Sequence, residues 1–219
     1  MDLIPQPPCD LVDKLPHPTP PFRAELTRTV AGSALKGEHN LQNAILAARL
    51  CQGAGASEAD ILNGIRLFEP LPHRLQEMRF GTKLFINDSI ATNPEATKAA
   101  IRTYTDRRLS VIVGGYDRDQ DFSGLASCLR DAPLHQIWFL PDSGHRIARM
   151  LEGADLPAHA RRAQNLEEIF SLLGADPDQF DVLLLSPGAP SFNQFRNYEQ
   201  RGDTFLDLAR KHFGPKRRP

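Results

Sequence analysis

The sequence predicts an α/β protein with a mainly parallel sheet and helices on both of its faces. From Leu71 onward, short apolar runs of strand-forming residues alternate with stretches of helical periodicity. The runs predict strands over 83–87, 109–113, 136–140 and 182–185, with a weaker strand near 158–163. The stretches predict helices over 94–104, 122–129, 144–151, 166–173 and 198–211. This alternation is typical of βαβ units, whose crossovers bring successive strand ends to one edge of the sheet.

The first 70 residues show a different pattern. Seven prolines lie among the first 25 residues, which predicts an irregular, partly mobile segment with one strand over 26–35. Helical periodicity begins at Glu38, and a second helix is expected from Ser57, a favourable N-cap residue, to Phe68. The sequence therefore predicts four parts: an irregular segment 1–36, a helical region 37–70, an α/β domain 71–213 and a basic tail 214–219.

Composition and charge argue against several classes of protein. The 219 residues carry 26 basic and 27 acidic side chains, and a net charge of −1 provides no electrostatic attraction to nucleic acid or to an anionic membrane. No apolar run reaches the roughly 18 residues that span a bilayer, and the N-terminus lacks a signal-peptide pattern. Three widely spaced cysteines suggest neither a disulfide framework nor a zinc site. We therefore expect a cytoplasmic protein whose own residues hold no metal.

A loop rich in Ser, Gly and Pro follows the last predicted strand and runs from Ser186 to Phe195. In open α/β sheets, ligands bind at the carboxyl edge of the strands. Unpaired backbone N–H groups in such a loop favour an anion, so it suits a carboxylate or a phosphate. For this loop alone, an ordinary connection between a strand and a helix is an equally good interpretation.

Two further loops are expected at the same edge. The loop that begins at Asn87 contains Asp88, Ser89 and Thr92, an acid and two hydroxyl groups that helix initiation at Asn93 and Pro94 does not explain. The loop that follows the strand 109–113 has paired glycines, which allow positive φ or close backbone approach. It also contains Arg118, which is either a carboxylate clamp or an ordinary surface arginine.

Polar side chains upstream of the α/β domain form a weaker signal. Asn40 and Asn43 are three residues apart and share a helix face, so their amides could bind the edge of a base. Capping or solvent exposure is the commoner role for such residues. The segment Leu71–Arg74 is expected to be a hinge, with His73 structural and Arg74 facing a phosphate.

Together these segments resemble the C-terminal part of a Mur ligase, in the branch that joins D-glutamate to UDP-N-acetylmuramoyl-L-alanine. The similar segments are GEHNLQNAILAA at 37–48, LPHR at 71–74, NDSIATNPEAT at 87–97, GGYDRDQDF at 114–122 and SPGAPSFNQFRNYEQRGDTF at 186–205. Each segment alone is modest, but the ordered set is highly specific and spans residues 37 to about 210.

The resemblance implies a three-domain ligase with a UDP-sugar domain, a central ATPase and a Rossmann-like C-terminal domain. Residues 37–70 would then be a helical remnant of the central domain. The family uses ATP and Mg²⁺ to phosphorylate the carboxylate of the sugar-peptide, and the amine of glutamate attacks the acyl phosphate. By this resemblance, the contacts to ATP would be Asn40, Asn43, Arg74 and Asp88. The residues around glutamate would be Thr92, Arg118, Ser191, Phe192 and Tyr198.

The chain departs from the family in its catalytic apparatus. It has no G-x-x-x-x-G-K-[ST] sequence, because Gly81-Thr82-Lys83 lacks the upstream glycine, and the central domain's magnesium ligands and lysine have no counterpart. Phosphoryl transfer depends on such positioning and cationic groups. We therefore expect no catalytic residue in this chain, no ATP or Mg²⁺ held by it alone, and no acyl phosphate made by the isolated chain.

The chain also departs from the family at the ligand edge. Ile90 stands where the family usually has lysine, Arg118 replaces a lysine, and Asn193 replaces an aspartate. Loss of a cation at 90 and moved donors at 118 predict that glutamate is handled differently, with a preference for L-glutamate as one hypothesis.

Three interpretations of the whole chain stay open. It is the glutamate-binding end of a ligase that is truncated or split, with the missing domains supplied in trans. Alternatively, it is a non-catalytic module that binds glutamate or a nucleotide, or an inactive remnant. Under the first interpretation the substrates of the complete ligase are glutamate and UDP-N-acetylmuramoyl-L-alanine.

Overall fold

The computed structural model describes residues 14–152, 159–176, 178 and 180–215. The chain divides into two units, Met1–Pro70 and Leu71–Pro219, each with its own hydrophobic core. The start of the expected irregular segment (1–13), Ala158 of the weak strand and the end of the basic tail (216–219) lie outside the described residues. Within the described ranges, no helix is long and apolar enough to cross a membrane.

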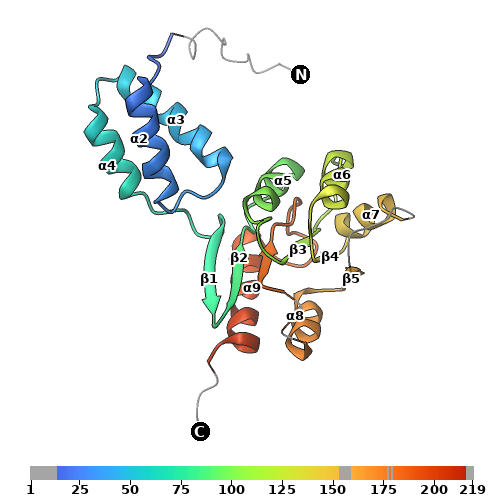
Figure 1. Ribbon diagram of the computed structural model, residues 1–219. Helices are drawn as coiled ribbons and strands as arrows, with labels where there is room; N and C mark the ends of the chain where they lie inside the picture. Colours follow the sequence, from blue (N-terminus) through green and yellow to red (C-terminus); the bar gives the residue numbers. More distant parts are fainter. Residues whose placement is uncertain (1–13, 153–158, 177, 179, 216–219) are drawn as a thin grey trace. The chain divides into compact units, whose positions relative to one another are not determined.

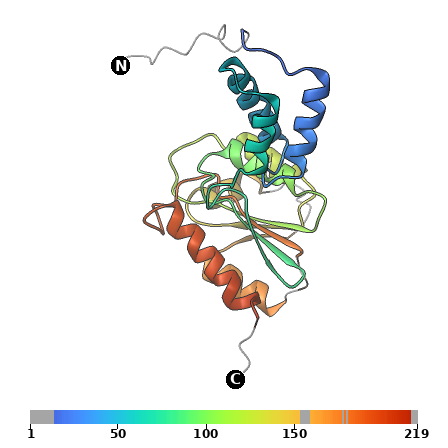
Figure 2. The ribbon, with the colours of Figure 1, turned by 90° about the vertical axis from the view of Figure 1, so that its left-hand side faces the viewer.

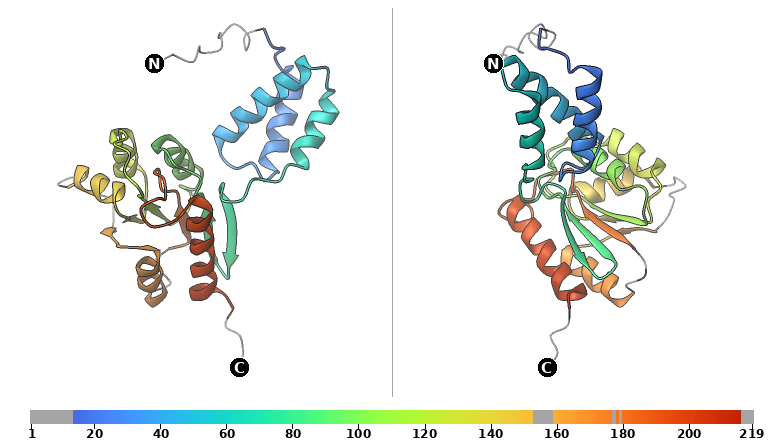
Figure 3. Two further views of the ribbon diagram at one scale, coloured as in Figure 1. Left: turned by 180° about the vertical axis from the view of Figure 1, so that it is seen from behind. Right: turned by 60° about the vertical axis from the view of Figure 1, so that its left-hand side comes forward.

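Among its described residues, the N-terminal unit contains the helices α2 (Pro20–Ala31), α3 (Glu38–Gly53) and α4 (Glu58–Arg66). Figure 3 shows these helices next to one another. The predicted N-cap is confirmed, because the Ser57 hydroxyl accepts a hydrogen bond from the backbone N–H of Asp60. All three helices contribute to one small core, whose buried members are Phe22, Leu26, Ile45, Ala48, Ile61 and Leu62.

The prediction of a strand over 26–35 is wrong, and the segment expected to be irregular contains α2. Phe22, Leu26 and Val30 are buried and recur every four residues, which places them on one helix face. Pro20 and Pro21 occupy the first helical turn, where a missing N–H does no harm. The prolines therefore start this helix instead of breaking it.

The C-terminal unit contains a sheet of six strands among its described residues, in the order β1-β2-β6-β3-β4-β5. The strands are β1 (Gln76–Phe80), β2 (Lys83–Asn87), β3 (Leu109–Val113), β4 (Gln136–Phe139), β5 (His159–Arg162) and β6 (Val182–Leu185). All neighbouring strands are parallel except β1 and β2, which form an antiparallel hairpin. The predicted α/β fold class is thus confirmed, with β1 as an edge strand that was not predicted.

In the described part of this unit, five α-helices cover the two faces of the sheet. Figure 1 shows their arrangement. They are α5 (Pro94–Thr103), α6 (Ser123–Asp131), α7 (Ser143–Met150), α8 (Leu166–Ala175) and α9 (Tyr198–Phe213). Successive strand residues point to opposite faces, so each strand serves both layers. In β3, for example, Val111 and Val113 pack under α5, α6 and α7, whereas Ile112 packs under α8 and α9.

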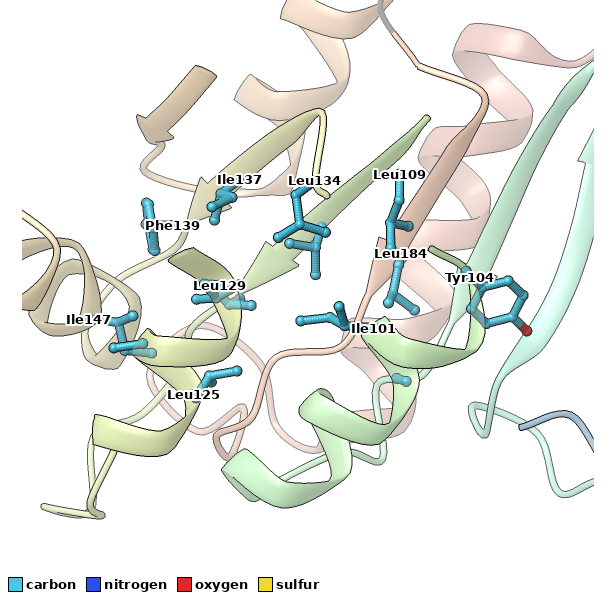
Figure 4. Close-up of a cluster of buried hydrophobic side chains, with 14 of the residues drawn as sticks. Ile101, Tyr104, Leu109, Leu125, Leu129, Leu134, Ile137, Phe139, Ile147 and Leu184 are labelled. Atoms are coloured by element: carbon cyan, nitrogen blue, oxygen red, sulfur yellow. The ribbon is translucent and has the colours of Figure 1, made fainter. Parts of the chain in front are cut away.

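Figure 4 shows the first of these layers, where Ile101, Leu125 and Ile147 from three helices lie against side chains of the sheet. On the other face α8 and α9 pack side by side, and Figure 2 shows the length of α9 along the unit. Because both faces are buried, the strands are nearly continuous apolar runs. Ligands can therefore reach the sheet only at its edges.

Candidate ligand site at the carboxyl edge of the sheet

Three loops meet at the carboxyl edge of the sheet, because β6 lies between β2 and β3. The loop after β6 is bonded to the loop after β2, since the N–H of Gly188 donates to the carbonyl of Ala91 at 2.9 Å. It is also bonded to the loop after β3, through Gly114 N to Pro187 O and Tyr116 N to Pro190 O, each at 2.8 Å. Segments that are roughly 70 to 100 residues apart in sequence thus form one connected surface, called here the loop platform (88–93, 114–122 and 186–197).

Paired glycines allow these loops to approach so closely. Gly114 has a φ of 115°, and a Cβ atom there would lie 2.4 Å from the carbonyl oxygen of Leu140. At Gly115 a Cβ atom would lie 2.3 Å from the carbonyl oxygen of Pro190. Both distances are shorter than real contacts, so the pair of glycines is required for this packing.

Arg201 of α9 lies beneath the loop platform and is bonded to two of its loops, and the sequence analysis missed it. Its side chain is 1% exposed, and it donates to the hydroxyl of Ser89 (2.9 Å), to the Ser89 carbonyl (2.8 Å) and to the Ala189 carbonyl (3.0 Å). Within the described ranges it has no ion pair. Burial without a counter-charge lowers its pKa to about 9. Its place on the apolar face of α9, four residues before Phe205, is the signal that could have revealed it.

Asp88 is a buried acid beneath the same platform. Its carboxylate accepts from the Ser186 hydroxyl at 2.8 Å and from the Leu75 N–H at 3.3 Å. Burial raises the pKa of Asp88 to about 6, because desolvation outweighs these two hydrogen bonds and the charge of Arg74. This carboxyl group is therefore poised to change its charge just below neutral pH.

His73 joins the start of the unit to the base of α9. Its Nδ1 atom lies 2.9 Å from Nδ2 of Asn87, and its ring meets that of Tyr198 edge to face at 5.9 Å. Its backbone has a φ of 63°, and its N–H donates to the side chain of Gln76. These contacts hold His73 in the fold, in line with the structural role expected for it.

The predicted glutamate residues all lie on or beside the loop platform. Ser191 is buried and Phe192 is 61% exposed, whereas Arg118 is exposed and makes no ion pair within the described part of the chain. Thr92 is half-buried, and its carbonyl accepts from the side chain of Gln120. Tyr198 is the first residue of α9.

The predicted ATP residues are divided between the two units. Arg74 is exposed and Asp88 is buried in the C-terminal unit. Asn40 and Asn43 belong to α3 of the N-terminal unit, where the Asn40 amide donates to the Lys36 carbonyl at 2.7 Å and Asn43 is exposed. Their role toward a nucleotide stays a prediction.

The departures from the family have distinct structural settings. The Asn193 amide donates to the carbonyl of Pro141 at 2.6 Å, a bond that an ionised aspartate could not make because it has no donor. Ile90 is half-buried, and its N–H donates to the His73 carbonyl. Across the described residues, no group of three or more His, Cys, Asp or Glu side chains is placed to hold a metal ion.

Comparison with known proteins agrees with this architecture. The family model described as "Mur ligase, glutamate ligase domain" matches residues 73–188. The chain is 35% identical over 176 residues to the UDP-N-acetylmuramoylalanine–D-glutamate ligase of Salinibacter ruber, covering 80% of this chain and 37% of that protein. It is 34% identical over 191 residues to the ligase of the same name from Escherichia coli K12, covering 86% of this chain and 42% of the relative.

Solved structures share the fold. MurF from Acinetobacter baumannii superposes with a TM-score of 0.61 at 24% identity, over 78% of this chain and 38% of that one. MurC from Thermotoga maritima superposes with a TM-score of 0.57 at 18% identity, over 80% of this chain and 38% of that one. The chain spans about two fifths of the length of its curated relatives. The match to the glutamate ligase domain model over residues 73–188 shows that the chain belongs to the Mur ligase family.

Proposed function

We propose that this chain is the glutamate-binding portion of an ATP-dependent ligase that joins glutamate to UDP-N-acetylmuramoyl-L-alanine in cytoplasmic peptidoglycan precursor synthesis. One observation carries the proposal: the loops that bear Thr92, Arg118 and Ser191 are joined by main-chain hydrogen bonds at the carboxyl edge of the sheet. A dicarboxylate amino acid suits this edge, because the edge offers the exposed guanidinium of Arg118, a hydroxyl group and the N-terminal ends of α5 and α9.

In this proposal the chain positions the nucleophile. Glutamate would be held by its carboxylates with its amine directed toward an acyl phosphate formed elsewhere in the complete ligase. Binding glutamate in a fixed position lowers the reaction barrier, because its translational and rotational entropy is already lost before the chemical step. The hydrogen bonds that Arg201 makes to the loops of Ser89 and Ala189 support such a role.

Parts of a nucleotide also find suitable groups here. By the family resemblance Asp88 would contact the nucleotide, although its carboxylate is buried here, and the exposed Arg74, whose charge acts on Asp88, suits a phosphate. In the complete ligase, Mg²⁺ would neutralise phosphate charge. The described residues offer no carboxylate cluster for that ion. We therefore expect Mg²⁺ to be held by groups outside them.

Titration of the purified chain with D-glutamate and L-glutamate, followed by amide NMR, tests the proposal. We expect one enantiomer to cause amide chemical-shift changes that are confined to the loop platform. If neither enantiomer binds, the proposal is refuted. Because Ile90 removes a cation and Asn193 is committed to Pro141, L-glutamate is the second candidate substrate. Tighter binding of D-glutamate would eliminate that candidate.

A ligase assay with ATP, glutamate and UDP-N-acetylmuramoyl-L-alanine tests the division of labour. We expect no product from the chain alone, since it has no phosphate-binding glycine loop. Product made by the purified chain would show that it contains its own activating apparatus. Product made only after addition of a separate protein with the ATPase domain would identify a split ligase.

A further inference from the structure

The loop after β3 is acidic, although it carries a residue proposed to bind an anion. Asp117, Asp119 and Asp121 surround Arg118 in five consecutive residues, so the loop alone has more negative than positive charge. These aspartates would repel a dicarboxylate ligand unless a further cation compensated their negative charge. The compensating cation is supplied from outside the loop.

Arg146 of α7 lies against this loop and binds Asp117 through two parallel hydrogen bonds. Its Nε and Nη2 atoms donate to the two carboxylate oxygens at 2.6 and 2.8 Å. The side chains of Arg146 and Asp117 are 32% and 20% exposed, so water screens the pair less than it would on an open surface. This bidentate geometry is the strong form of an arginine–carboxylate pair.

Arg146 also contacts the far end of the loop. Its Nη2 atom donates to the Gln120 carbonyl at 2.8 Å, and its guanidinium lies 4.8 Å from the centre of the Phe122 ring. Gln120 in turn donates from its side chain to the carbonyl of Thr92 at 3.3 Å. The side chain of Arg146 therefore holds the loop of Arg118 in place directly. It is also connected, through Gln120, to the loop of Thr92.

The charges of this region are arranged to leave Arg118 available. The hydrogen bond between Arg146 and Asp117 lowers the pKa of Asp117 and raises the pKa of Arg146, and the charges of Asp117, Asp119 and Asp121 raise the pKa of Arg146 further. In the described part of the chain, Arg118 itself has no ion pair and is exposed. The acids of the loop are thus partly neutralised by Arg146 rather than by Arg118.

We propose that Arg146 is a positioning residue that neutralises the acidic loop 117–121 and fixes its conformation, so that Arg118 can bind a carboxylate of the substrate amino acid. This inference rests on the proposed function for its ligand. The pair itself is observed independently of any ligand.

The experiment measures glutamate affinity by amide NMR titration for four forms of the chain: wild type, Arg146→Gln, Asp117→Asn and the double variant. Arg146→Gln should weaken binding by about tenfold, because an uncompensated carboxylate then faces the ligand. The double variant should recover part of the lost affinity, because it lacks that carboxylate. A merely structural pair would leave the double variant as weak as Arg146→Gln.

Arg130→Gln is the matched control. Arg130 pairs with Asp131 at 2.9 Å on α6, is 47% exposed, and among the described residues its side-chain hydrogen bonds go to Asp131 alone. The Arg130→Gln variant should bind glutamate with the affinity of the wild type. Trp138, the one tryptophan of the chain, lies in β4. Its fluorescence therefore shows whether each variant keeps the fold of the C-terminal unit.

The outcomes separate the two proposals. If wild type binds neither enantiomer, the proposed function fails and this inference fails with it. If wild type binds but Arg146→Gln binds equally well, or if the double variant recovers nothing, the role of Arg146 is refuted while the proposed function stands.

Discussion

Two buried regions of the C-terminal unit are organised by different forces: the aromatic cluster under α8 and α9, and the loop platform at the carboxyl edge. In the cluster Phe85 is surrounded by five other phenylalanine rings with centroid distances of 5.1 to 6.3 Å. At the platform, buried polar groups are paired by hydrogen bonds: Arg201 donates to Ser89, and Ser186 donates to Asp88.

The contrast shows what each region contributes. Apolar packing is non-directional and supplies most of the free energy of folding. Hydrogen bonds between buried groups contribute less net energy, but they fix each atom in place and are costly to leave unmade. We therefore expect the cluster to dominate stability, and the platform to dominate ligand binding and the response to pH.

The largest expected effect is on the cluster. Phe85→Ala should lower the free energy of unfolding by about 3–5 kcal/mol, because it removes a fully buried ring at the centre of the cluster. Denaturant unfolding followed by Trp138 fluorescence reports on this unit. Phe192→Ala is the control, since Phe192 is 61% exposed and should change stability by less than about 0.5 kcal/mol. Equal losses in the two variants would contradict the assignment of the core.

Asp88 should make stability depend on pH. Its pKa is about 6 in the folded chain and 3.8 in the reference state, so the folded form binds a proton more tightly. The favourable contribution of this protonated carboxyl group to the free energy of unfolding is complete below about pH 4 and is lost as the pH rises through about 6. The total loss is about 3 kcal/mol, at 1.36 kcal/mol per pKa unit. Asp88→Asn cannot ionise, so its stability relative to wild type should rise over that pH range. A constant difference between the two proteins from pH 4 to pH 7 would contradict the buried, partly neutral carboxyl group.

Arg201→Gln should cost about 2 kcal/mol, because the carbonyls of Ser89 and Ala189 lose their donors. Removal of a buried charge that has no counter-ion among the described residues offsets part of this loss. The variant should also lose glutamate binding. Arg210→Gln, on the exposed side of the same helix, should change neither property. Full glutamate binding by Arg201→Gln would show that the platform keeps its shape without this residue.

Asn193→Asp should have the smallest effect, about 1 kcal/mol at neutral pH. It restores the residue that the family usually has, but it replaces a donor with a carboxylate opposite the Pro141 carbonyl. The destabilisation should fade as the pH falls and the new acid is protonated. A change in enantiomer preference without loss of stability would instead make position 193 a determinant of specificity.

Sequence patterns predicted most of the C-terminal unit. The strands 83–87, 109–113 and 182–185 have the predicted bounds, because they are buried on both faces and read as continuous apolar runs. β1 was missed because Gln76–Phe80 lies at the edge and alternates between half-buried and exposed residues. α2 was missed because its prolines were interpreted as breakers, although they stand in the first turn.

The order of residues in the chain was enough to determine the α/β alternation, the polar loops at strand ends and the resemblance to the Mur ligases, since all three are local patterns. Only the tertiary structure decided how those loops are held. Arg201 reaches Ser89 across 112 residues, and Arg146 reaches Asp117 from another helix. The periodicity of the sequence does not reveal such partners. They come together only when the chain folds, and a buried charged side chain then needs hydrogen-bond partners from distant segments in place of water.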